Sequence, residues 1–237
     1  MPYYKQAHGE DSNCVIISPS ILSVEPKNLR KIIKELERCE VGSIHVDVMD
    51  GRFVPNVSYG VQVFSSIRRY AKVPLEVHLM VQDPSNHIKE FADAGADAII
   101  IHYEASGNKN SILEEIRAFG KRSGIAINPE TDFNSVKGHM KYADIILVMS
   151  VHPGSGGQKF IPDSLDKIKV ARRLIDKGNS GTMIAVDGGI NIETGKQACS
   201  CGADELVVGT AIINSKSISD SIKEFKKIRR MGKNIPN

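Results

Sequence analysis

The sequence predicts a protein of the α/β class, folded as a single eight-stranded parallel β/α barrel. Three observations predict it. The chain has 237 residues, which lies within the range of one such barrel. Eight short, β-branched apolar runs are spread along it, separated by amphipathic segments long enough for helices. The runs are apolar throughout, as in parallel strands that are covered on both faces. Together these features describe a TIM barrel.

The strands are expected where β-branched and other apolar residues cluster, in chain order at 15–17, 44–48, 75–79, 98–101, 125–127, 145–148, 183–186 and 206–208. Helices are expected where apolar residues recur every three or four positions, at 29–36, 61–70, 88–94, 112–119 and 165–175. Gly95 and Gly202 each begin a Gly-Ala-Asp turn, which is typical of a helix end that leads into a strand. The basic tail at 216–233 has the apolar spacing of an outer amphipathic helix.

An open, doubly wound sheet is the alternative fold, but eight strand and helix units in this length favour a closed barrel. One domain is therefore expected over residues 1–237. Within it, residues 1–13 are predicted to form a polar N-terminal extension, and residues 232–237 a polar C-terminal tail.

Composition excludes several classes of function. The 31 basic and 28 acidic side chains are dispersed and give a net charge of only +3, which argues against nucleic-acid binding. Four cysteines without a two-residue spacing indicate a reducing compartment rather than a disulfide framework or a zinc motif. No run approaches the ~20 apolar residues of a membrane helix. We expect a cytoplasmic protein that does not associate with membranes.

Candidate chemistry lies at the carboxyl ends of the strands, where barrels of this kind form their active sites. His45 and Asp47 are two positions apart on one strand, so both side chains lie on the same face. His78 and Asp187 come from two other strand ends. Two imidazoles and two carboxylates suit one divalent ion such as Zn²⁺, Fe²⁺, Mn²⁺ or Co²⁺. His102, at the fourth strand end, is expected to make hydrogen bonds rather than to bind the ion.

Glycine-rich turns follow the last three strands and predict a phosphate site. Their backbone N–H groups can approach an anion closely and bind it without a basic side chain. The turns contain Gly154, Ser155, Gly156 and Gly157 after strand six, Gly188 and Gly189 after strand seven, and Gly209 and Thr210 after strand eight. A small phosphorylated ligand is therefore the expected partner.

The run His-Val-Asp-Val-Met-Asp-Gly-Arg-Phe-Val-Pro-Asn at 45–56 closely resembles the signature of the ribulose-phosphate 3-epimerase family. Further matches follow in family order at 18–22, 77–81, 148–151, 156–160 and 186–190, so that the resemblance extends from residue 16 to about 213. It implies a β/α barrel that interconverts ribulose 5-phosphate and xylulose 5-phosphate in the pentose phosphate pathway. The reaction inverts carbon 3 and uses a divalent metal.

The resemblance also implies residue roles. His45, Asp47, His78 and Asp187 would hold the metal; Asp47 would be the first base and Asp187 the acid; and Ser20, His78 and Asp187 would contact substrate. The phosphate would be bound by the glycine turns described above. Met49, Met80 and Met149 match positions that form an apolar lining near the reacting carbons. Family members commonly associate, so a homo-oligomer is expected.

Two positions of the loop after strand six depart from the family pattern. Ser155 stands where the family usually has phenylalanine, and His152 where asparagine or an acidic residue is common. Because this loop closes over substrate, the change leaves open a six-carbon substrate such as allulose 6-phosphate. Lyases and decarboxylases of related barrels place a lysine near the reacting centre, and no strand-end lysine is found here. A non-catalytic sugar-phosphate sensor would tolerate the loss of Asp47 or Asp187, yet both are present.

Overall fold

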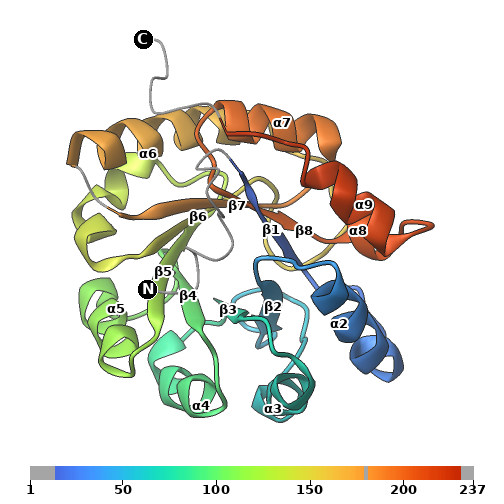
Figure 1. The fold of residues 1–237 in the computed structure, drawn as a ribbon. Coiled ribbons are helices and arrows are strands. Elements are labelled where there is room, and N and C mark those ends of the chain that lie inside the picture. Colours follow the sequence, from blue (N-terminus) through green and yellow to red (C-terminus); the bar gives the residue numbers. More distant parts are fainter. Residues whose placement is uncertain (1–13, 179–180, 231–237) are drawn as a thin grey trace.

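The computed structural model describes residues 14–178 and 181–230, and these form a barrel (Figure 1). Within this part of the chain one sheet contains eight parallel strands in the order β1-β8-β7-β6-β5-β4-β3-β2. The strands are β1 Ile16–Pro19, β2 Ile44–Met49, β3 Leu75–Met80, β4 Ala98–His102, β5 Arg122–Ile127, β6 Ile145–Met149, β7 Met183–Asp187 and β8 Glu205–Val208. The closed arrangement, and not the open doubly wound sheet, is the fold that the sequence encodes.

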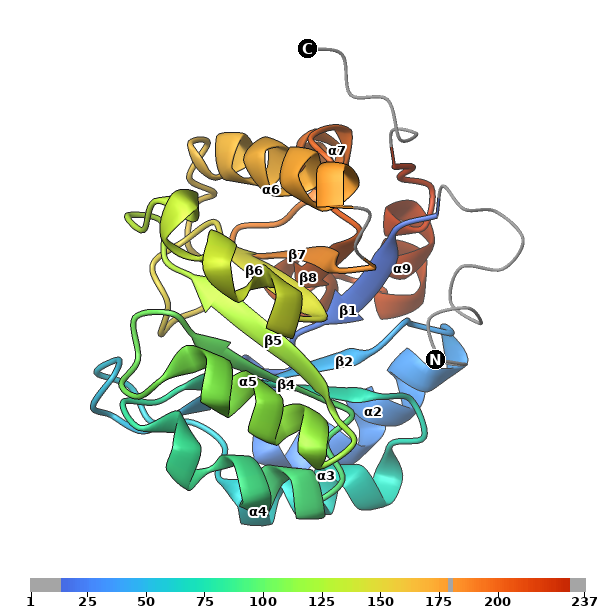
Figure 2. The same cartoon turned by 90° about the vertical axis from the view of Figure 1, so that its left-hand side faces the viewer.

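Helices follow the strands and surround the sheet (Figures 1 and 2). Each buries its apolar residues against the outer face of the strands, which gives the main hydrophobic core. The helices are α2 Leu29–Arg38, α3 Val61–Tyr70, α4 Ile88–Asp93, α5 Lys109–Ala118, α6 Ser164–Gly178, α7 Ile192–Ser200, α8 Thr210–Ile213 and α9 Ile218–Phe225. Short 3₁₀ helices lie at Pro26–Asn28, Pro84–Asn86, Phe133–Ser135 and Lys137–Tyr142.

The barrel closes between β1 and β2 through a short seam. Ser20 and His45 form an isolated parallel bridge there, and the Ile21 amide donates to the His45 carbonyl at 3.2 Å. The Gly42 amide donates to the Ile17 carbonyl at 3.0 Å. A Cβ at Gly42 would lie 2.4 Å from the Ile16 side chain, so a larger residue could not approach β1 this closely. The remaining neighbouring strands pair through longer ladders.

The barrel interior is divided by polarity. One part is filled with small and branched apolar side chains from β4 to β8, including Ile100, Leu147 and Val207. The part bounded by β1, β2 and β3 instead contains buried polar side chains, among them His45 and His78. Burying such groups is unfavourable unless they are paired or serve a site, so this side of the interior marks where chemistry is to be sought.

Most predicted elements are confirmed, with four differences. β5 begins three residues earlier than expected, because Arg122-Ser123-Gly124 carries no apolar signal although it pairs with both neighbouring strands. α7 and the four-residue α8 were not predicted from periodicity. The tail helix is shorter than 216–233, since α9 ends at Phe225. Residues 1–13 and 232–237, predicted to be polar extensions, lie outside the described residues. Within the described ranges, no helix has the length and apolar character required to cross a membrane.

Candidate active site

The strand registers bring the predicted site residues together. Asp47 of β2 and His78 of β3 are direct cross-strand neighbours, and Ser20 after β1 is bridged to His45. His45 and Asp47 lie on the same face of β2, as their spacing predicts. Asp187 arrives at the end of β7, on the other side of β8 and β1. The fold thus places side chains from distant parts of the chain in one small volume.

One nitrogen or oxygen atom from each of four residues converges on a point. These atoms, from His45, Asp47, His78 and Asp187, all lie within 4.8 Å of one another. The Nε2 atom of His45 is 3.5 Å from Asp47 Oδ1 and 4.0 Å from Asp187 Oδ2. The Nδ1 atom of His78 is 3.1 Å from Asp47 Oδ1 and 3.8 Å from Asp187 Oδ2. The four residues that the sequence selected as ligands are therefore assembled.

This donor set fits a divalent cation. Four ligand atoms at ~2.0–2.2 Å from one ion in a tetrahedron lie roughly 3.4 Å apart, close to the separations found here. His45 is fully buried, yet within the described residues neither of its ring nitrogens has a hydrogen-bond partner. A buried polar atom without a partner is rare, and a bound ion would satisfy it. The two carboxylates would also be stabilised by the positive charge.

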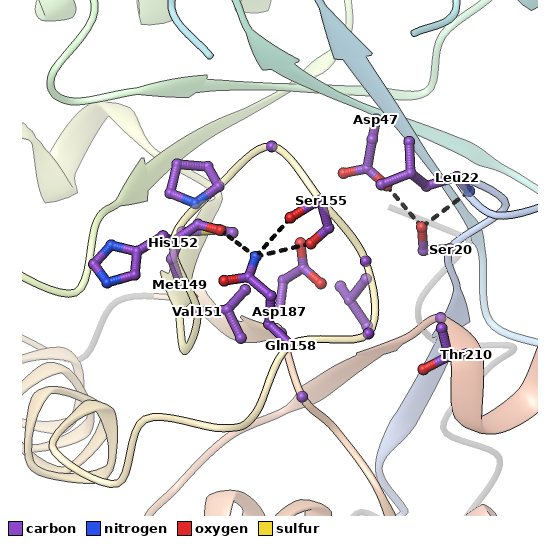
Figure 3. A pocket seen from close by; sticks show the side chains of 18 of the residues that line it. Ser20, Leu22, Asp47, Met149, Val151, His152, Ser155, Gln158, Asp187 and Thr210 are labelled. Atoms are coloured by element: carbon purple, nitrogen blue, oxygen red, sulfur yellow. Dashed lines mark hydrogen bonds between the residues drawn. The ribbon is translucent and has the colours of Figure 1, made fainter. Parts of the chain in front are cut away.

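The two aspartates have opposite protonation preferences. Burial alone would raise the pKa of Asp47, but the charge of the neighbouring His45 lowers it far below its usual range. Ser20 adds a hydrogen bond from its hydroxyl to Asp47 Oδ2 at 2.7 Å (Figure 3). By contrast, burial and the neighbouring Asp47 carboxylate raise the pKa of Asp187 to about 7. The structure therefore favours an ionised Asp47 facing a protonated Asp187.

The two imidazoles also differ. Burial lowers the pKa of His45, but the carboxylates of Asp47, Glu76 and Asp187 outweigh burial and raise it well above its ordinary value. Burial, together with the neighbouring imidazoles of His102 and His45, lowers the pKa of His78 to about 4, although Asp47 opposes the shift. His78 is consequently neutral at physiological pH, which is the form that binds metals.

A pocket opens directly above the cluster at the carboxyl end of the barrel (Figure 3). It is lined by Ser20, Leu22, Ser23, Asp47, Met49, Met80, Met149, Val151, His152, Pro153, Gly154, Ser155, Gly156, Gly157, Gln158, Asp187, Gly188, Gly189, Ile190, Val207, Gly209 and Thr210. All three predicted methionines and all the predicted glycine-turn residues are in this set. His78 is not, so its contact with substrate stays a prediction.

The glycine turns are tight for a physical reason. Gly188 and Gly189 have φ values of +118° and +61°, in the region that favours glycine. A Cβ at Gly189 would lie 2.4 Å from the backbone nitrogen of Phe160, and one at Gly188 would lie 2.4 Å from the Val151 side chain. The turn after β7 is thus packed against the loop after β6, which leaves backbone atoms rather than side chains at this wall of the pocket.

The loop after β6 is held over the pocket by amide side chains. The Gln158 amide donates to the carbonyls of His152 at 2.7 Å and Ser155 at 2.9 Å (Figure 3). From the opposite rim, the Asn56 amide donates to the Gly154 carbonyl at 2.8 Å. Sequence reasoning did not assign a role to Asn56 or Gln158, although both lie in runs that resemble the family, because neither side chain carries a charge.

Three more acidic side chains lie near the ligands. Asp50 turns away from the cluster and accepts hydrogen bonds from the Arg52, Phe53 and Gln82 amides. Glu76 and Glu205, both fully buried below the ligands, were missed by sequence reasoning. Period-two spacing could have found Glu76, since it lies on the same face of β3 as His78.

Comparisons with known proteins agree with this geometry. Residues 16–213 match the model of the ribulose-phosphate 3 epimerase family. A ribulose-phosphate 3-epimerase of Synechocystis sp. is 38% identical over 221 residues, covering 92% of this chain and 96% of that protein. One from Bacillus subtilis is 38% identical over 89% of this chain and 97% of its own, and one from Chlamydia muridarum is 41% identical over 86% and 91%.

Solved structures agree in fold. A crystal structure of 3-hexulose-6-phosphate synthase superposes with a TM-score of 0.69, covers 90% of this chain and 99% of that one, and is 15% identical. At that identity the likeness concerns the barrel alone. The family match spans most of the chain and includes every residue of the four-atom cluster. The chain therefore belongs to the ribulose-phosphate 3-epimerase family of isomerases.

Proposed function

We propose that the protein inverts carbon 3 of ribulose 5-phosphate to give xylulose 5-phosphate, as a step of the pentose phosphate pathway. The relatives that share 34–41% of its residues carry the name ribulose-phosphate 3-epimerase. The pocket supplies what such a reaction needs, which is two acid/base groups beside a site for an anionic sugar. We further propose, from the resemblance, that the protein is a homo-oligomer in the cytoplasm. Light scattering on the purified protein would test the oligomeric state.

The chemistry needs a base and an acid of opposite protonation state. The proton on carbon 3 is transferred to the Asp47 carboxylate, and the electron pair left behind is shared with the neighbouring carbonyl as an enediolate. The Asp187 carboxyl then gives its proton to the other face of carbon 3, so that the net result is inversion. The opposite pKa shifts of the two aspartates favour this assignment of roles.

His45, Asp47, His78 and Asp187 would together hold one divalent ion, of which Zn²⁺, Fe²⁺, Mn²⁺ and Co²⁺ all suit the donors. Such an ion, when bound, polarises the ketose carbonyl and stabilises the negative charge that develops on the substrate oxygens. Ser20 holds one oxygen of Asp47 and thereby restricts the orientation of its carboxylate. The buried imidazoles exclude water from the lower side of the site.

The phosphate would be bound at the glycine turns, with Gly188, Gly189, Gly209 and Thr210 forming one wall and the loop after β6 the other. Backbone N–H groups supply the hydrogen bonds, in keeping with a pocket that contains no lysine or arginine among its lining residues. Met49, Met80 and Met149 would give the reacting carbons an apolar surface. Such a surface disfavours water and so protects the enediolate from solvent.

The observation that carries this proposal is the placement of Asp47 and Asp187 together in one cluster with two buried imidazoles, where both carboxyls also line the pocket. Asp47→Asn or Asp187→Asn should reduce epimerisation and solvent-deuterium exchange at carbon 3 by on the order of 10²-fold or more, because each removes one acid/base group. Proton NMR in deuterated water measures both. Asp220→Asn, an exposed site on α9, is the matched control. Retained activity in both active-site variants would refute the two-base scheme.

Ser155 supports a second candidate substrate. It lines the pocket, and its hydroxyl accepts a 3.3 Å hydrogen bond from the Gln158 amide. A serine side chain is smaller than the phenylalanine usual at this position, so it occupies less space below the loop. A six-carbon ketose phosphate such as allulose 6-phosphate would use the same aspartates. Measuring kcat/KM on both sugars with metal-analysed protein decides between them, and a higher value for allulose 6-phosphate would replace the five-carbon assignment.

A further inference from the structure

Behind the predicted ligand His78 lies a chain of side chains that the proposed chemistry does not use. The Nε2 atom of His78 is 2.9 Å from His102 Nε2, and His102 Nδ1 is 3.2 Å from Glu104 Oε2. Both rings are fully buried and stack at 5.0 Å with an interplanar angle of 23°. Phe53 packs against His102 with ring centroids 4.8 Å apart. The chain leads from the cluster to the loop after β5.

The direction of these hydrogen bonds is determined at the far end. Glu104 Oε1 is 2.9 Å from the backbone nitrogen of Asn128, and an amide N–H can only donate. The Thr131 hydroxyl also donates to this oxygen. Because the carboxylate of Glu104 has no proton of its own, it accepts at both oxygens. The remaining partner, His102 Nδ1, must therefore carry the proton of that bond.

The same argument applies to the next hydrogen bond, between His102 and His78. A neutral imidazole has one N–H, so His102 with its proton on Nδ1 offers a lone pair at Nε2. His78 then donates from its Nε2–H, and its own lone pair is on Nδ1. That atom lies 3.1 Å from Asp47 Oδ1 and 3.8 Å from Asp187 Oδ2, and a cation bound between it and the two carboxylates would take the place of a proton on Nδ1. It is the His78 atom that faces the cluster, and its lone pair is what a cation requires.

We propose that Glu104, acting through His102, is a positioning residue that keeps the Nδ1 lone pair of His78 directed at the cation. The inference rests on the metal site proposed above. It gives Glu104 a role in metal affinity although the residue touches neither the ion nor the sugar. His45 differs, because its Nδ1 lies 3.7 Å from Glu76 Oε2 and its ring nitrogens make no hydrogen bond within the described residues.

Glu104→Gln tests the donor-to-acceptor direction of these hydrogen bonds. The glutamine amide carries N–H groups, so it cannot accept from His102 and Asn128 at the same time. Either the Asn128 amide loses its partner, or His102 changes its tautomer and leaves His78 with a proton on Nδ1. We expect Co²⁺ to bind the metal-free variant about 10–100-fold more weakly than the wild type. Absorption titration measures this affinity without reference to turnover.

Two variants at His102 separate the effect of hydrogen-bond direction from the effect of ring packing. His102→Gln can accept from His78 through its carbonyl oxygen and donate to Glu104 through its amide, so it preserves the direction and should bind Co²⁺ within about threefold of wild type. His102→Phe keeps the ring but removes both hydrogen bonds and should weaken binding about tenfold or more. Glu90→Gln is the matched control, since His87 and Glu90 form an ordinary His–Glu pair at 2.6 Å away from the site.

The outcomes are distinct. Urea unfolding of each metal-free protein first establishes that the fold is intact. Weak binding by Glu104→Gln and His102→Phe, with His102→Gln and Glu90→Gln near wild type, supports the inference. Wild-type affinity in Glu104→Gln, or equal losses in His102→Gln and His102→Phe, overturns it while the metal site stands. If Glu104→Gln does not fold, the two His102 variants decide. A wild-type protein that binds no Co²⁺ refutes the metal site and this inference together.

Discussion

Glu205 shows how a single buried side chain can set the stability of the barrel. It is fully buried on β8, and its Oε1 accepts from Ser43 at 3.3 Å. Burial and the neighbouring Glu76 carboxyl raise the pKa of Glu205 well above its ordinary value. The raised pKa favours a protonated Glu205 beside the Glu76 carboxyl, below the ligand cluster. A raised carboxyl pKa means that the folded state keeps a proton that the unfolded chain releases above about pH 4.5.

This residue gives a pH-dependent prediction. As pH rises from about 4.5, holding that proton costs wild type about 1.4 kcal/mol of unfolding free energy per pH unit. Glu205→Gln, which is neutral at every pH, avoids the cost and can donate to Glu76. The variant should therefore exceed wild type in stability at pH 7, with the difference shrinking as pH falls toward 4.5. Urea unfolding of metal-free protein across this range measures the difference, and a difference independent of pH would contradict a raised pKa of Glu205.

At the scale of elements, the strands that sequence predicts best are those whose residues are apolar on both faces. β6, with Ile-Ile-Leu-Val-Met, differs from its predicted bounds by one residue. β5 was predicted too short because its first half is polar, and its pairing depends on neighbours that single-sequence periodicity does not see. α7 begins at a capping box of Asn191 and Thr194 that was not recognised.

The candidate site, like the strands and helices, could be predicted in part from the sequence. The four proposed ligands and the glycine turns stand at strand ends, where chain position alone reveals them. Glu205 and Asn56 could not be assigned, because their importance comes from which side chains the fold places next to them. Spatial proximity between residues far apart in sequence is a property of the packed barrel and not of any local pattern.

The turn after β7 allows a test of backbone geometry. Gly189→Ala should destabilise the protein by about 3 kcal/mol, since the new Cβ overlaps the Phe160 backbone and the residue has positive φ. The displaced N–H groups should also raise KM for the sugar phosphate by about tenfold or more. Gly120→Ala is the control: its φ is +71°, but nothing lies within 4 Å of the added Cβ. If Gly120→Ala raised KM as much as Gly189→Ala does, positive φ and not close packing would be the cause of the rise.

At the scale of the whole molecule, the β1–β2 seam has the shortest strand pairing of the described barrel. One isolated bridge and two nearby backbone hydrogen bonds join these strands in the described structure, whereas β2 and β3 pair over six residues. The Ser20 hydroxyl, which bonds to Asp47, also crosses this seam. Closure of the barrel and assembly of the site are therefore coupled.

Hydrogen exchange should reveal this difference. The amides of Ile21 and Gly42, which donate across the seam, should exchange through openings of lower free energy than those of the β2–β3 ladder, such as Val46 and Glu76. Exchange of the metal-free protein followed by mass spectrometry or NMR measures both. Equal protection at the two places would mean that the barrel opens as one unit.

The seam has a consequence for how the protein is made on the ribosome. β1 is synthesised first, but its ladder is with β8, in which Ile16 pairs with Glu205. The earliest strand must therefore wait, with its edge uncovered, until nearly the whole barrel has emerged. A nascent chain that stops before β8 would leave this edge free to associate with other chains, so translational pausing in the last βα unit is where we expect aggregation to begin.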